Sequence, residues 1–150
     1  TLFVPLGNGT LFIGMVKGLE ELRAGGLITA MPHIVAVQSE HCDPFVQAFR
    51  AGETKPAAVT PRPTMAEGIA IGVPARGEEI LAYSYRYGIE IITAPESRIL
   101  TARKALAAKG IYCEHTTAAT YAAYLEYNET KGPADDCLIP MCGAGLKSDH

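Results

Sequence analysis

The segment from Val4 to Leu22, VPLGNGTLFIGMVKGLEEL, decides the fold of this 150-residue chain. A short apolar stretch at residues 2–5 predicts a β-strand, and the glycine turn at residues 7–10 follows it directly. The apolar residues after the turn recur at helical spacing and predict a helix: Leu11, Phe12, Met15, Val16, Leu19 and Leu22. A strand that turns through glycines into a helix is the beginning of a βα unit.

The turn itself is a candidate binding site. Glycine lets the backbone turn tightly and leaves its N–H groups exposed, while the positive end of the following helix points at the same place. Such a turn suits an anion, and a phosphate best of all. Gly7, Asn8, Gly9 and Thr10 are therefore candidate phosphate-binding residues. An ordinary βα loop without a ligand is the alternative, and this stretch alone does not decide between the two.

Composition limits the classes of protein and of site. The length predicts a single domain over residues 1–150. The net charge is −3 and 19% of the residues are charged, so the composition predicts no basic surface for nucleic acid. The sequence contains no run of 18 apolar residues, so we expect no membrane span. The four cysteines form no C-x-x-C pair and no zinc-like spacing with a histidine. We therefore expect reduced thiols in a cytoplasmic protein, and no metal site.

Further strands and helices alternate along the chain. Apolar runs predict strands at residues 33–38, 89–92 and 137–141, and the first of these is continuously apolar, as in a parallel strand covered on both faces. Helices are predicted over residues 44–50, 78–87, 94–109 and from 117 or 118 onward. The expected fold is α/β, a doubly wound, mostly parallel sheet with helices on both faces.

Several local signals support these boundaries. Thr93 and Glu96 fit a capping box, Asp43 an N-cap, and Thr116 or Thr117 the cap of the last helix. Gly25 is placed for the left-handed position after the first helix. Residues 51–63 predict an irregular surface excursion, and the small residues of TMAEGIAIGVP, which follow, predict a close approach to a ligand or to another part of the chain.

Two more segments follow predicted strands. Cys142-Gly143-Ala144-Gly145 is a second glycine turn, and Ser39-Glu40-His41-Cys42 lies where ligands gather in open α/β sheets. For His41 and Cys42 we favour a structural role. A dinucleotide site is disfavoured because Phe12 stands where a third glycine is needed, and a P-loop is excluded because no Gly-Lys-Ser/Thr follows. The phosphate of a smaller cofactor fits the first turn better.

The order of these motifs resembles a known family. The matching segments are VPLGNGT with KGLEEL, IVAVQSE, TMAEGIAIGVP, residues 114–119 (EHTTAA), and the terminal CGAGLK. Together they resemble the large domain of fold-type II, tryptophan-synthase-β-like pyridoxal-phosphate enzymes, with threonine synthases as the most similar members. Two positions depart from the pattern: Cys142 stands where threonine synthases commonly carry Thr-Gly-x-Gly, and His115 replaces an expected proline.

The resemblance implies roles for residues of this chain. Gly7, Asn8, Gly9 and Thr10 match the loop that holds the cofactor phosphate, and Cys142 matches the position beside the pyridine nitrogen. The lysine that forms the Schiff base lies upstream of this portion in the family, so no catalytic residue is expected here and the chain is expected to be an inactive part of a longer enzyme. We interpret the chain's own lysines as solvated surface: Lys17, Lys55, Lys104, Lys109, Lys131 and Lys147.

The implied reaction is that of a threonine synthase, which converts O-phosphohomoserine to threonine and phosphate by elimination and water addition. A threonine or serine ammonia-lyase of the same fold is the alternative, and a non-catalytic phosphate- or nucleotide-binding module is an alternative of another class. The expected cofactor is pyridoxal 5′-phosphate, and the expected partners are a small amino-acid substrate and, in the full-length enzyme, a second copy in a homodimer.

Overall fold

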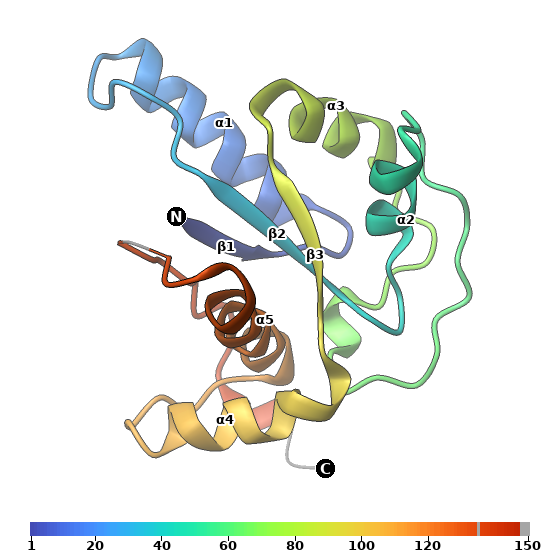
Figure 1. Ribbon diagram of the computed structural model, residues 1–150, viewed down its shortest axis with the longest axis vertical. Helices are drawn as coiled ribbons and strands as arrows, with labels where there is room; N and C mark the ends of the chain where they lie inside the picture. The colour runs from blue at the N-terminus through green and yellow to red at the C-terminus, as the bar shows by residue number, and fades with distance from the viewer. Residues whose placement is uncertain (135, 148–150) are drawn as a thin grey trace.

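Three parallel strands in the order β1-β2-β3 form the centre of the structure (Figure 1). The computed structural model describes residues 1–134 and 136–147. Its strands are β1 (Leu2–Pro5), β2 (Ile34–Ser39) and β3 (Glu90–Ala94). Its α-helices are α1 (Thr10–Ala24), α2 (Pro44–Ala51), α3 (Gly77–Tyr87), α4 (Ile99–Ala107) and α5 (His115–Lys131). Three single 3₁₀ turns complete the list: η1 (Glu67–Ile69), η2 (Glu96–Arg98) and η3 (Gly145–Lys147).

Both faces of the sheet are buried. Strand β2 is buried at every position, because successive side chains point to opposite faces and each face is covered by helices. Ile34 and Ala36 belong to the core beneath α1, α2 and α3, whereas Val35 and Val37 belong to the core beneath α4 and α5. This is why the run is continuously apolar, as the sequence predicts for a parallel strand.

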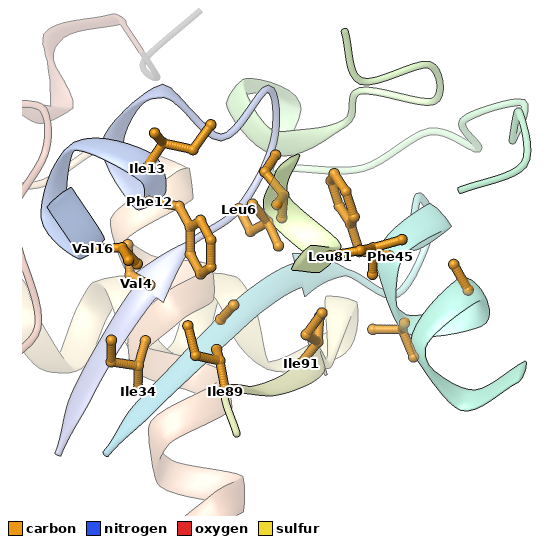
Figure 2. Close-up of a cluster of buried hydrophobic side chains, with 14 residues drawn as sticks. Val4, Leu6, Phe12, Ile13, Val16, Ile34, Phe45, Leu81, Ile89 and Ile91 are labelled. Atoms are coloured by element: carbon orange, nitrogen blue, oxygen red, sulfur yellow. The ribbon is translucent and has the colours of Figure 1, made fainter. Parts of the chain in front are cut away.

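The first of these cores is built on α1. Figure 2 shows Phe12 and Val16 of α1 lying against the strand residues Val4 and Ile34, with Phe45 of α2 and Leu81 of α3 further along the sheet. The buried positions of α1 are Phe12, Ile13 and Val16, while Leu11 and Leu22 are 40% exposed. The side of α1 that carries Phe12, Ile13 and Val16 therefore faces the sheet.

The second core lies on the opposite face. Phe3 of β1 makes edge-to-face contacts with Tyr124 and Tyr127 of α5, at centroid distances of 5.4 and 5.3 Å. Ile99 and Leu106 of α4 complete this layer. Helices on both faces of a parallel sheet confirm the predicted α/β fold.

The chain reverses its direction of winding at β1. Helices α1, α2 and α3, which connect the three strands, lie on one face of the sheet. After β3 the chain crosses to the other face, where α4 and α5 lie. It then returns beside β1, where Leu138 forms a parallel bridge with Leu2. In open parallel sheets of this kind, ligands bind outside the carboxyl ends of the strands, next to such a reversal of winding. Both glycine turns follow the two segments that meet there.

The prediction of a strand at residues 137–141 is wrong. Leu138 alone pairs with the sheet: its N–H donates to Thr1 O at 3.0 Å and its C=O accepts from Phe3 N at 3.0 Å. Pro140 has no N–H to continue the ladder, so the pairing remains a single bridge.

Of the helices in the described part of the chain, none is long and apolar enough to span a membrane.

Three predicted helix signals are also wrong. Thr93 lies inside β3, so there is no capping box, and α5 begins at His115 with Glu114 at the N-cap. Gly25 has a right-handed backbone with φ −78°, and the left-handed residue is Gly26 with φ 73°. At the predicted capping box, Glu96 instead bonds to Thr64 and to the amide of Met65.

Candidate functional site

The first glycine turn joins the end of β1 to α1 and requires glycine at two positions. Gly9 is the N-cap of α1 and has a left-handed backbone with φ 82°, a conformation that other residues rarely adopt. Gly7 lies under η1: an ideal Cβ on Gly7 would be 3.0 Å from the Cα of Ile69 and 3.1 Å from the carbonyl oxygen of Gly68. Gly7 and Gly9 are buried, whereas Asn8 is exposed.

The turn presents a set of unpaired backbone donors. Leu6 N donates to Val37 O and Ile13 N donates to Gly9 O, but among the described residues no hydrogen bond is assigned to the amides of residues 7–12. The first turn of α1 contains no acidic residue and the N-cap makes no side-chain bond. These donors coincide with the positive end of a 15-residue helix. The arrangement fits a phosphate group.

The second glycine turn is held at the first turn of α5. The amide of Cys142 donates to Thr117 Oγ1 at 3.3 Å, and Glu114 N donates to Gly143 O at 2.9 Å. The Glu114 carboxylate lies against Gly143, where an ideal Cβ would be 2.7 Å from Glu114 Cδ. Cys142 is exposed at this end of the sheet.

Segment η1 connects the two turns. On one side its backbone packs on Gly7, and on the other an ideal Cβ on Gly68 would lie 2.6 Å from Thr116 Oγ1 in the first turn of α5. The predicted close approach of this small-residue segment is confirmed. All five sequence-predicted site residues therefore lie at one end of the sheet, in two turns joined by η1 and by the beginning of α5.

Desolvation, together with nearby charges at the beginning of α5, shifts the pKa of two titratable groups. Burial and the Arg103 charge lower the pKa of His115, against the opposing charges of Glu67, Glu96 and Glu114. Although Cys142 is exposed as a residue, partial desolvation of its thiol, and then the Glu114 charge, raise its pKa. Cys142 therefore presents a neutral thiol, a weak donor and acceptor.

Glu96 positions the segment that leads into η1, a role that the sequence analysis missed. Its carboxylate accepts hydrogen bonds from Thr64 Oγ1 and from the amide of Met65, both at 2.5 Å. Thr64 also accepts from the amide of Ala66 at 3.1 Å and contacts the Ser39 hydroxyl at 3.0 Å. These bonds link the ends of β2 and β3 to η1, and so to the first glycine turn.

The structure supports a structural role for His41 and Cys42. His41 Nδ1 bonds to the Pro63 carbonyl and its amide donates to Ser39 Oγ at 3.1 Å. Cys42 is fully buried, and its burial raises the pKa of its thiol.

The described residues include no group of three or more metal-ligating side chains that could hold an ion.

The lysines for which the structure describes a side chain lie on the surface, as predicted. They are exposed at Lys17, Lys55, Lys104, Lys109 and Lys131. The side chain of Lys147 lies outside the described residues.

Known proteins resemble this chain in sequence. Three curated relatives are threonine synthases: that of Methanocaldococcus jannaschii is 30% identical over 150 residues, that of Synechocystis sp. 26% over 147, and that of Mycobacterium leprae 29% over 149. Each alignment covers 96–97% of this chain but only 36–39% of the relative. The chain thus spans little more than a third of the length of these relatives.

Solved structures share the fold. Threonine deaminase isoform 2 of Solanum lycopersicum superposes with a TM-score of 0.76 at 19% identity, over 95% of this chain and 39% of that one. A fungal L-serine ammonia-lyase from Rhizomucor miehei gives 0.74 at 19% identity, over 95% and 44%. The family model for pyridoxal-phosphate dependent enzymes matches residues 1–143. This chain belongs to the family of pyridoxal-phosphate dependent enzymes.

Proposed function

We propose that this chain carries the phosphate-binding and ring-facing half of the cofactor site of a threonine synthase. The reaction would convert O-phosphohomoserine and water to threonine and inorganic phosphate. The observation that carries the proposal is the run of unpaired amides at residues 7–12, at the positive end of α1. The similarity to three curated threonine synthases supports this choice of reaction.

The proposal assigns one role to the first glycine turn and another to Cys142. The amides of Gly7, Asn8, Gly9 and Thr10 hold the cofactor phosphate, and Cys142 meets the pyridine nitrogen. When bound, pyridoxal phosphate supplies the electron sink for the elimination and the water addition. The neutral thiol of Cys142 contacts the ring without supplying a charge that would hold a proton on its nitrogen. No lysine of this chain takes part.

An ammonia-lyase acting on threonine or serine is the second candidate. It is favoured by the cysteine at position 142, where the synthase pattern has Thr-Gly-x-Gly, and the fold is shared with a threonine deaminase and a serine ammonia-lyase. Titrating the full-length protein with O-phosphohomoserine and, separately, with threonine distinguishes the two, since only a synthase needs a second anion site for the substrate phosphate.

Binding to the isolated half-site can be measured with pyridoxamine 5′-phosphate, which has no aldehyde to react with surface lysines. Inorganic phosphate reports on the glycine loop alone, and pyridoxamine without its phosphate reports on the ring site alone. We expect calorimetry to show binding of pyridoxamine 5′-phosphate that excess inorganic phosphate displaces.

Thr10 offers a matched pair of variants, because it is exposed in the first turn of α1. Thr10→Asp adds a negative charge that stabilises the helix by about 0.3–1 kcal/mol but repels a phosphate. We expect it to weaken both phosphate ligands by about tenfold, or ~1.4 kcal/mol, without lowering the free energy of unfolding. Thr10→Asn is the neutral control. Equal affinities of the two variants would refute the phosphate site.

A further inference from the structure

The second glycine turn is closed by a short antiparallel clasp, formed by residues 112–114 and 143–145. Cys113 bridges to Ala144, the amide of Glu114 donates to Gly143 O at 2.9 Å, and the amide of Gly145 donates to Tyr112 O at 3.2 Å. The clasp begins at the residue after Cys142, so the position of Cys142 depends on it.

Arg103 of α4 bridges the two arms of this clasp. Its Nε donates to Cys113 O at 3.0 Å and its Nη2 donates to Gly145 O at 3.3 Å, so one guanidinium binds a carbonyl from each arm. Its Cζ also lies 5.3 Å from the ring centroid of Tyr112. The planar fork of arginine suits such a two-point contact, whereas a lysine ammonium offers a single point of charge.

Gly145 shows how closely the clasp packs. An ideal Cβ there would lie 2.8 Å from Arg103 Nη2 and 2.8 Å from Tyr112 Cζ. The packing of Arg103 and Tyr112 therefore requires glycine at position 145. Its backbone conformation does not, since Gly145 is not among the glycines with positive φ. The second glycine turn is thus fixed to α4 through Arg103 and to α5 through Thr117.

We propose that Arg103 is a positioning residue that holds the Cys142–Gly145 turn where Cys142 meets the pyridine ring of the cofactor. The inference rests on the proposed function, since it assumes that the ring binds at Cys142. Arg103 acts on the turn itself, because its Nε and Nη2 donate to the carbonyls of Cys113 and Gly145. Loss of Arg103 should therefore affect ring binding and leave phosphate binding at residues 7–10 unchanged.

The test compares Arg103→Gln and Arg103→Lys with Arg98→Gln. Arg98 is the matched control because it lies just before the same helix but forms an exposed pair with Glu129. We expect Arg103→Gln to weaken pyridoxamine 5′-phosphate by roughly tenfold, the lower end of what loss of an outer-shell partner costs at metal sites, and to leave inorganic phosphate within about twofold. Arg103→Lys should not restore ring binding, and Arg98→Gln should bind both ligands as wild type does.

Hydrogen exchange provides a readout that is independent of the ligands. The amides of Glu114 and Gly145, which close the clasp, should exchange faster in both Arg103 variants than in Arg98→Gln, while the amide of Ile13 in α1 should not change. The Lys variant keeps the charge and decides the question if the Gln variant fails to fold. Unchanged pyridoxamine 5′-phosphate affinity, or parallel loss of both ligands, would overturn the inference. Wild-type protein that binds neither ligand would instead contradict the proposed function, and the exchange rates would still decide whether Arg103 holds the turn.

Discussion

Gly9 and Ile80 pack so closely that a side chain at position 9 would displace the buried side chain of Ile80. An ideal Cβ on Gly9 would lie 2.9 Å from Ile80 Cγ1 and closer still to its Cδ1. The first glycine turn is thus packed against α3, a helix that contributes none of the proposed ligand contacts. Substitutions at Gly9 change the fold and the binding site together, which is why Thr10 is the better position for a binding test.

Replacing Gly9 should therefore destabilise the domain. We expect Gly9→Ala to lower the free energy of unfolding by about 2 kcal/mol or more, because the left-handed backbone alone costs roughly 1–2 kcal/mol for a residue with a Cβ. Gly14 is the control: it lies in the same helix with no neighbouring atom within 4 Å of an added Cβ. Gly14→Ala should stabilise the protein by about 0.5–1 kcal/mol. Urea unfolding of both variants measures the difference, and a Gly9→Ala variant as stable as wild type would contradict the packing.

Glu114 should suppress the reactivity of Cys142. Burial and the Glu114 charge raise the pKa of the Cys142 thiol, so the nucleophilic thiolate is scarce at pH 7–8. Glu114→Gln removes the charge and should lower this pKa, so alkylation of Cys142 by iodoacetamide should become faster at pH 8. The side chain of Glu114 makes no capping bond to α5, so the helix should survive.

The rate is best followed by mass spectrometry of the peptide that contains Cys142. Cys42 and Cys113 are buried and should react slowly in every variant. Glu21→Gln removes an exposed carboxylate on α1 and serves as the charge control. An alkylation rate that is the same in both variants would show that Glu114 does not act on the thiol.

Substitutions of Cys142 itself should separate its role at the ring from a merely structural one. Cys142→Ser keeps a neutral hydroxyl and should bind pyridoxamine 5′-phosphate within a few-fold of wild type. An aspartate would hold a proton on the pyridine nitrogen, so in the full-length enzyme Cys142→Asp should change the reaction specificity or abolish turnover. Cys137→Ser is the control thiol. An Asp variant with unaltered activity would indicate that Cys142 is only structural.

Stability should depend on pH through Glu90, at the end of the sheet opposite the site. Burial raises the pKa of Glu90, but hydrogen bonds from Lys131 and Tyr127, with the charges of Lys131 and His33, outweigh it and lower the pKa overall. Because the pKa of Glu90 is lower in the folded state, its ionised carboxylate stabilises the protein when the pH is above the ordinary carboxyl pKa. This stabilisation is lost as the pH falls through the pKa that Glu90 has in the folded state.

Glu90→Gln should therefore destabilise the protein by about 1 kcal/mol at pH 7, and the difference from wild type should shrink below pH 4. Urea unfolding at pH 7 and at pH 3.5 tests this, with Glu21→Gln as the control for removing one exposed charge. A difference that stays constant between pH 7 and pH 3.5 would exclude Glu90 as its source.

The fold could be predicted because its signals are local. The continuous apolar run at β2 and the strand–glycine–helix sequence at residues 2–24 each depend on neighbouring residues only. The helix starts were harder, because distant groups replace the local caps. Gln38 Oε1 accepts from the amides of Phe45 and Val46 at the start of α2, where Asp43 makes no side-chain cap. Glu96 likewise bonds to Thr64 instead of capping α4.

The same limit applies to the candidate site. The two glycine turns were visible in the sequence because each follows an apolar run, but the residues that hold them were not. Thr117, Arg103 and Glu114 reach the second turn from 25 to 42 residues away along the chain. Such contacts arise from the return of the chain to the β1 edge, for which no spacing in the sequence provides a signal.

The final prediction is that no lysine of this chain forms the covalent bond to the cofactor. Lys17 and Lys55 lie in exposed ion pairs with Glu79 and Glu78, at 3.5 and 3.4 Å, on the surface of α1 and in the loop before α3. Neither belongs to the turns that form the site. Treatment with pyridoxal phosphate followed by borohydride should therefore label several surface lysines partially, and excess inorganic phosphate should not protect any one of them. Peptide mapping provides the measurement, with Lys17→Arg and Lys55→Arg as controls that should each lose only their own share of label. Stoichiometric labelling of a single lysine, together with threonine formation from O-phosphohomoserine, would place the catalytic lysine within these 150 residues and refute the prediction.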